Sequence, residues 1–150
     1  MIQVFNNFFS PDMYNKMVAH SLDGWRLNND HIEKDHTDKF YLEDCILHME
    51  KIFKKKVSVY RAYSNGDSIV PRYLHIDRNS SHTALLYLND HYNKDWLGGT
   101  VIFQNDQVNY VNFLPNRLVL FDAHLEHIGS NFQNTNNLRL INVWKINIKE

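Results

Sequence analysis

The chain has 150 residues, of which 43% are hydrophobic and 13% aromatic, enough to bury the core of one domain. We expect a single domain over residues 1–150, with a helical support region at 1–56 and the functional core at 57–150. The 16 basic and 17 acidic residues give a net charge of −1, so no global field attracts nucleic acid or an anionic membrane, and neither is expected as a partner.

The start of the chain and its single cysteine favour a cytoplasmic protein. Residues 1–7 lack the basic start and long apolar run of a signal peptide, and no later stretch approaches the roughly 18 apolar residues of a membrane span. Cys45 has no second cysteine to pair with, which suits a reducing compartment. Because Cys45 lies in a helical apolar pattern, we expect it in the core.

The first half of the support region predicts a helix and then a polar loop. Ser10 is the expected N-cap, with Pro11 at the first helical position, and Gly24 is the expected end of the helix. Its apolar face comprises Met13, Tyr14, Met17, Val18 and Leu22. Residues 28–39 are almost wholly polar, which predicts a surface loop, either a plain connector or a lid.

A second helix is predicted before residue 57. Its helical spacing is carried by Leu42, Cys45, Ile46, Met49, Ile52 and Phe53. The three lysines at 54–56 suit a helix C-terminus, and we interpret them as capping and solvation rather than nucleic-acid contacts.

From Val57 onward the pattern changes to alternation and β-forming residues, separated by turns. Candidate strands are 57–63, 69–76, 83–89, 100–103, 107–112, 117–122 and 138–148. Expected turns lie at 65–67, 98–99, 105–106 and 115–116. Many short strands after two helices predict a mainly β fold, a sandwich or jelly roll with the helices packed on one sheet.

The residues His75 and Asp77 form a His-x-Asp pair, and His127 follows the first histidine by 52 positions (127 − 75). Side chains two apart on a strand point to one face, so His75 and Asp77 can grip one metal. Two imidazoles and one carboxylate form the facial triad of non-haem Fe(II) oxygenases. A lone His-x-Asp is a weak signal in a chain with nine histidines.

The alternative distal ligand is His124, three residues before His127. An offset of three places the two on different faces of an extended strand, so they are not equivalent. We interpret His124 as a rim or core residue. The other histidines are expected to be surface or structural residues: His20, His31, His36, His48, His82 and His91.

The surroundings of these residues resemble the prolyl 4-hydroxylase-like branch of the 2-oxoglutarate, Fe(II)-dependent oxygenases, from about Val57 to Trp144. The matching pieces, in order, are Tyr60-Arg61-Ala62-Tyr63 with Asn65-Gly66, Leu74-His75-Ile76-Asp77, Thr83-Ala84-Leu85-Leu86-Tyr87-Leu88-Asn89, Trp96-Leu97-Gly98-Gly99-Thr100, Pro115-Asn116-Arg117-Leu118-Val119-Leu120-Phe121-Asp122, His127, and Arg139 followed by Trp144. Their order and spacing make the signal specific. The resemblance implies a double-stranded β-helix core of the jelly-roll, cupin-like type.

The resemblance also implies the site. His75, Asp77 and His127 would ligate Fe(II), the spacing from Phe121 selecting His127 over His124. Arg139 would bind the far carboxylate of 2-oxoglutarate with a bidentate fork, assisted by Tyr87, and Tyr63 would line the site. The interval from His127 to Arg139 is longer than the family's commonest spacing, and residues 67–73 match poorly where the family often contacts substrate.

The implied activity is hydroxylation of an unactivated C–H bond with dioxygen and 2-oxoglutarate, releasing succinate and CO₂, with ascorbate a candidate additional requirement. If the resemblance extends to substrate, the target is a prolyl residue in a peptide or protein. Alternatives are a free amino acid or other small metabolite, and a catalytically silent jelly-roll binding domain. A zinc hydrolase ranks lowest, because it lacks a clear general base and has no use for Arg139.

Overall fold

A computed structural model describes residues 1–21, 26–28, 31–67 and 73–150 of the chain. The helical elements are α1 (Pro11–His20), a π-helical turn η1 (Phe40–Asp44) continuing into α2 (Cys45–Phe53), and a short 3₁₀ turn η2 (Lys94–Trp96). The strands are β1 (Ile2–Phe5), β2 (Arg26–Asn28), β3 (His31–Asp35), β4 (Lys56–Asp67), β5 (His82–Tyr87), β6 (Thr100–Gln104), β7 (Gln107–Val111), β8 (Leu118–Asp122), β9 (His127–Gly129) and β10 (Arg139–Lys149).

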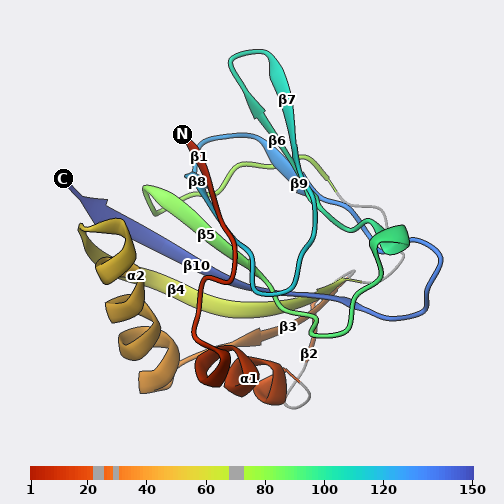
Figure 1. Ribbon diagram of the computed structural model, residues 1–150. Coiled ribbons are helices and arrows are strands. Elements are labelled where there is room, and N and C mark those ends of the chain that lie inside the picture. Colours follow the sequence, from red (N-terminus) through yellow and green to blue (C-terminus); the bar gives the residue numbers. More distant parts are fainter. Residues whose placement is uncertain (22–25, 29–30, 68–72) are drawn as a thin grey trace.

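Most of the strands form one antiparallel sheet with the order β1-β8-β5-β10-β4-β3-β2. The two α-helices cover one face of this sheet (Figure 1). They meet it through an apolar layer that includes Met17, Tyr41, Met49 and Trp144, each buried to within 1% exposure. The indole N–H of Trp144 donates to the Tyr41 carbonyl at 3.1 Å, which connects the largest fully buried side chain of β10 to η1.

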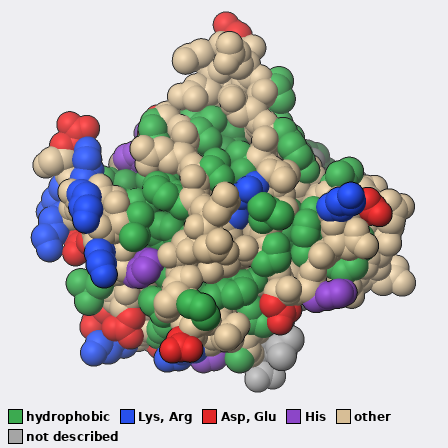
Figure 2. Space-filling view, viewed as in Figure 1, with side chains coloured by type: hydrophobic (Ala, Val, Ile, Leu, Met, Phe, Trp, Pro, Cys, Tyr) green, Lys and Arg blue, Asp and Glu red, His purple; other side chains and the backbone are tan. Residues whose placement is uncertain are grey.

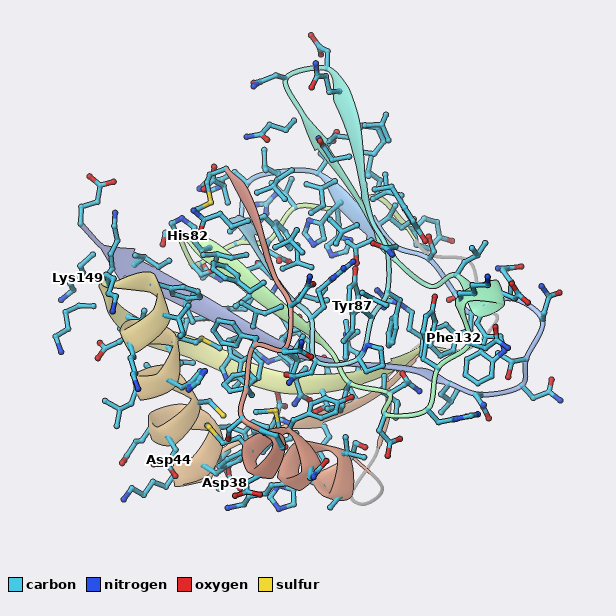
Figure 3. The ribbon with its side chains drawn as sticks, viewed as in Figure 1. Asp38, Asp44, His82, Tyr87, Phe132 and Lys149 are labelled. Atoms are coloured by element: carbon cyan, nitrogen blue, oxygen red, sulfur yellow. The ribbon has the colours of Figure 1, made fainter. Side chains whose placement is uncertain are left out.

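A smaller sheet of three antiparallel strands, ordered β7-β6-β9, faces the other side of the large sheet (Figure 1). A second apolar layer lies between the sheets and includes Tyr87, Ile102, Phe113, Phe121 and Phe132. Figure 3 labels Tyr87 and Phe132 in this layer, with Asp38 and Asp44 on the helical side. Alternation along β10 therefore decides which core each residue joins.

The predicted helices are confirmed in their main features. The Ser10 side chain accepts from Met13 N at 3.3 Å, with Pro11 at the first helical position. This helix ends at His20, and the expected end at Gly24 lies outside the described residues. The second helix ends at Phe53, and its C-cap Lys54 has a left-handed φ of 58°. Cys45 is fully buried as predicted.

Three predictions, one for the segment before the β region and two within that region, need correction. The predicted loop at 28–39 instead contains β3, which pairs with β4 and adds a strand where polar composition masked it. The predicted turn at 65–67 is the end of β4, paired with Arg139–Ile141 of β10. A strand at 69–76 is not observed within 73–76, where His75 makes only an isolated bridge, while 69–72 lie outside the described residues.

Strands β1, β2 and β9 were not predicted from the sequence, because each is short and is defined by its partner rather than by its own pattern. The remaining expected strands are confirmed with small shifts of their ends. Among the described residues, no helix has the length and apolarity to cross a membrane. In Figure 2, basic side chains gather beside α2, where Lys51 and the three lysines at 54–56 lie at its C-terminal end.

Candidate metal centre

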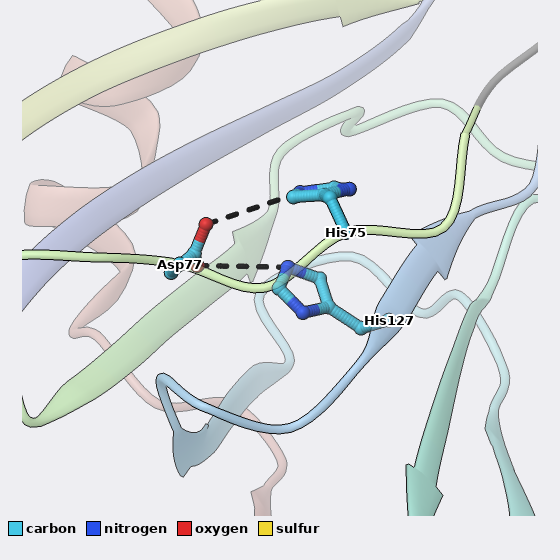
Figure 4. Close-up of side chains that lie close together, drawn as sticks. All are labelled: His75, Asp77 and His127. Carbon is cyan, nitrogen blue, oxygen red and sulfur yellow. Dashed lines mark ion pairs between the residues drawn. The ribbon is translucent and has the colours of Figure 1, made fainter.

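The structure brings His75, Asp77 and His127 together. One potential ligand atom from each lies within 4.8 Å of the other two, and in the part of the chain that the structure describes this is the one such group. Figure 4 shows the two imidazoles turned toward the carboxylate. His75 Nε2 lies 3.9 Å from Asp77 Oδ1, and His127 Nε2 lies 3.5 Å from Asp77 Oδ2.

Backbone hydrogen bonds position all three residues. His75 N donates to His127 O at 3.1 Å, and His127 N donates to His75 O at 2.9 Å. Asp77 N donates to Ala123 O at 2.8 Å, which fixes the segment after His75 against the turn that follows β8. The His-x-Asp pair is therefore held beside the turn between β8 and β9, although it is not part of a continuous strand.

The two histidines present the same nitrogen toward the centre. His75 Nδ1 lies 3.0 Å from Tyr73 O, and His127 Nδ1 lies 2.9 Å from Leu125 O. A carbonyl oxygen only accepts, so each Nδ1 carries a proton, and Nε2 is the nitrogen of each ring that is left to bind a metal. Burial lowers the pKa of His127, which keeps its imidazole neutral at pH 7.

The carboxylate of Asp77 is buried and ionised. Burial raises its pKa, but the Lys145 ammonium, in contact with Oδ2, and the Thr83 hydroxyl, which donates to Oδ2 at 2.5 Å, together hold the pKa below its usual value. Burial lowers the pKa of Lys145, because it disfavours the charged ammonium, and the Asp77 carboxylate opposes that effect. The donor set is thus two imidazole nitrogens and one carboxylate, which fits Fe(II).

A pocket leads from these three residues to Arg139 at the start of β10. Its lining includes the apolar side chains of Leu85, Ile141 and Val143, together with the aromatic ring of Tyr63. Tyr63 is 8% exposed, and the Arg61 guanidinium lies 4.2 Å from its ring centroid. Tyr63 thus lies in the pocket wall, and its predicted part in the site stays a prediction.

Arg139 is 1% exposed and is oriented by the segment before β6. Its Nε donates to Gly98 O at 2.5 Å, and its Nη2 donates to Thr100 Oγ1 at 3.2 Å. Gly98 has a φ of 82°, and a Cβ there would lie 2.3 Å from the Phe132 ring, so this turn requires glycine. Burial lowers the pKa of Arg139, yet a guanidinium stays charged at neutral pH.

Tyr87 is fully buried beside Arg139 rather than exposed in the pocket wall. Its hydroxyl bonds to Thr100 Oγ1 at 2.9 Å and to Val111 O at 3.0 Å, and its ring centroid lies 5.6 Å from the Arg139 guanidinium carbon. A direct contact of Tyr87 with a cosubstrate stays a prediction. In the structure it supports Arg139 through their shared partner Thr100.

His124 lies in the turn after β8 and is exposed, outside the group formed by the three candidate ligands. Three further residues at the site, Lys145, Thr83 and Thr100, were not predicted as site residues. Lys145 was detectable, because Arg139, Ile141, Val143 and Lys145 alternate along one face of β10. Thr83 and Thr100 carried no sequence signal that separates them from other strand threonines.

Comparison with known proteins gives a match in structure alone. No family model matches the chain, and no curated protein matches it in sequence. A Pseudomonas putida prolyl-4-hydroxylase structure superimposes with a TM-score of 0.72 at 12% identity, covering 96% of this chain and 91% of that one. A 2OG-Fe(II) oxygenase family oxidoreductase from Burkholderia pseudomallei gives 0.75 at 11% identity, covering 97% and 83%.

Two further structures carry bound molecules. A Trichoplax adhaerens prolyl hydroxylase in complex with a hypoxia inducible factor peptide gives a TM-score of 0.66 at 15% identity, covering 95% of this chain and 82% of that one. HygX from Streptomyces hygroscopicus, with nickel and 2-oxoglutarate bound, gives 0.72 at 10% identity, covering 97% and 82%. The predicted resemblance to prolyl 4-hydroxylase-like 2-oxoglutarate, Fe(II)-dependent oxygenases is thereby confirmed at the level of the fold.

Proposed function

We propose that the protein is an Fe(II)- and 2-oxoglutarate-dependent dioxygenase that hydroxylates an unactivated C–H bond and releases succinate and CO₂. The observation that carries the proposal is one pocket lined both by His75, Asp77 and His127 and by the buried cation Arg139. A metal triad alone is compatible with hydrolysis, whereas a triad with a buried guanidinium suits a chelating dianion.

Each residue has a defined task in this proposal. The two Nε2 atoms and the Asp77 carboxylate hold the metal, which when bound supplies the activation of dioxygen. Arg139 binds the far carboxylate of 2-oxoglutarate and so fixes which end of it faces the metal. Leu85, Ile141 and Val143 limit water in the pocket, which strengthens the electrostatic contacts within it.

A prolyl residue in a peptide or protein is the substrate we favour. The support is the similarity to two prolyl hydroxylase structures, one of them with a peptide bound. A small molecule is the alternative, because HygX has also been solved with hygromycin B bound.

We also propose the double-stranded β-helix core and the cytoplasmic location. The two facing sheets support the double-stranded β-helix. The buried, lone Cys45 is compatible with a cytoplasmic location.

The decisive experiment is an anaerobic titration of metal-free protein with Fe(II) and 2-oxoglutarate, monitored by the visible metal-to-ligand charge-transfer band. The band should form in the wild type, vanish in His127→Ala, and need far more 2-oxoglutarate in Arg139→Ala. Folded wild-type protein that gives no band would favour the silent binding domain. Product analysis with proline-containing peptides against free metabolites then separates the two substrate classes.

A further inference from the structure

A second buried cation lies in the pocket and has no task in the scheme above. Lys145 lines the pocket, its side chain is 11% exposed, and its ammonium contacts Asp77 Oδ2. The same carboxylate is the candidate metal ligand. The Lys145 Nζ also lies 5.9 Å from the Tyr63 ring centroid, so the ammonium sits between the Asp77 carboxylate and the aromatic wall of the pocket.

The position of Lys145 is fixed by strand pairing. Lys145 pairs with Arg61 on β4 and with Thr83 on β5, in the middle of the large sheet. Thr83 donates to the same Oδ2 that Lys145 contacts. Asp77 therefore meets one neutral donor and one charged donor, both held by the rigid sheet rather than by loops.

A cation at this place has opposite effects on the divalent metal and on an anion bound to that metal. A divalent metal bound by Asp77 is repelled by Lys145 and must share the carboxylate charge with it. An anion bound at the metal is attracted by Lys145 instead. Charges a few ångströms apart in a partly buried site are only weakly screened by solvent, so both effects are measurable.

We propose that Lys145 exchanges metal affinity for anion affinity: it weakens the hold of the site on a divalent metal alone and strengthens the binding of an anionic ligand to the metal-loaded site. This inference rests on the proposed function. Lys145 then adjusts the metal and anion affinities of the site through its contact with Asp77. This role accounts for a lysine between a carboxylate ligand and an aromatic wall.

The test compares Lys145→Met, Lys145→Gln and Lys145→Arg with the wild type, anaerobically and without turnover. Two affinities are measured by calorimetry or by the charge-transfer band: Fe(II) alone, and 2-oxoglutarate for the Fe(II)-loaded protein. In the neutral variants Fe(II) should bind about tenfold more tightly and 2-oxoglutarate about tenfold more weakly. Lys145→Arg keeps the charge and should retain the wild-type pattern.

Thr83→Val is the matched control, because it removes the neutral donor from the same oxygen without changing the charge. It should not give the opposed pair of changes. Circular dichroism establishes that each variant is folded, and the Met and Gln variants serve as substitutes for each other. A purely structural role for Lys145 would weaken both affinities together in the neutral variants, which would overturn the inference while leaving the proposed function intact. A wild type that binds neither ligand would overturn both.

Discussion

His75 and His127 are directly opposed residues joined by two backbone hydrogen bonds, of 3.1 and 2.9 Å, and their ring centroids lie 4.3 Å apart. Reciprocal bonds of this kind form a hydrogen-bonded pair in antiparallel geometry. The two imidazoles therefore occupy neighbouring places although they come from distant parts of the chain. The separation of the candidate ligands is set by the backbone and not by side-chain flexibility.

The first prediction separates the two candidate distal histidines. His127→Ala should abolish Fe(II) binding, because it removes a buried Nε2 that faces Asp77. His124→Ala should leave Fe(II) affinity within about twofold, since an exposed turn residue makes no contribution to the site. Anaerobic Fe(II) titration measures both. Loss of binding in His124→Ala with retention in His127→Ala would reverse the assignment.

The second prediction concerns Gly129, which lies against Arg139. A Cβ at residue 129 would lie 3.0 Å from Arg139 Nη1 and 3.2 Å from Cζ. Gly129→Ala should displace the guanidinium and weaken 2-oxoglutarate binding about tenfold, or about 1.4 kcal/mol, with Fe(II) affinity unchanged. Ser130→Ala is the neighbouring control. Equal 2-oxoglutarate affinity in Gly129→Ala and the wild type would argue against Arg139 as the anchor.

The third prediction concerns the pH dependence of stability through His36. Burial, with a further contribution from Lys34, lowers the pKa of His36 from 6.5 to about 4, and its ring stacks on Tyr41 at 3.6 Å. As the pH falls, His36 therefore becomes protonated in the unfolded chain at a higher pH than in the folded protein. Stability from the neutral ring is complete above pH 6.5, declines as the pH falls toward 4, and changes no further below it.

His36→Phe keeps a stacked ring but cannot titrate. Between pH 7 and pH 4.5 the wild type should lose about 2–3 kcal/mol more unfolding free energy than this variant. Urea denaturation at both values measures the difference. The variant will be less stable at pH 7, because it loses the 2.6 Å contact between His36 Nε2 and Ser64 Oγ. Parallel pH profiles would show that His36 does not carry this effect.

The fourth prediction concerns the core between the helices and the large sheet. Trp144→Ala should cost about 3–5 kcal/mol of unfolding free energy, because it opens a cavity in the fully buried layer and removes the indole hydrogen bond to the Tyr41 carbonyl. Leu47→Ala, at a site 62% exposed on α2, should change stability by less than about 0.5 kcal/mol. Similar losses in the two variants would contradict the two-layer core.

The sequence by itself determined the features that depend on local pattern. Helix spacing with Ser10 and Pro11 located α1, and alternation located β5, β6, β7, β8 and β10 near their observed limits. The order of the motifs predicted the three candidate ligands and Arg139, and the structure lines one pocket with all four, while their roles stay predictions. These are properties of short segments, for which propensity and periodicity are sufficient.

The tertiary structure decided what depends on partners distant in the chain. The mostly polar segment 31–35 became β3 because β4 offered an unpaired edge. Strand β4 continued through the expected turn at Asn65 because β10 pairs with it there. The roles of Lys145 and Thr83 at Asp77 arise only once β10 and β5 lie side by side. Pairing energy and burial are gained between strands, so no single segment encodes them.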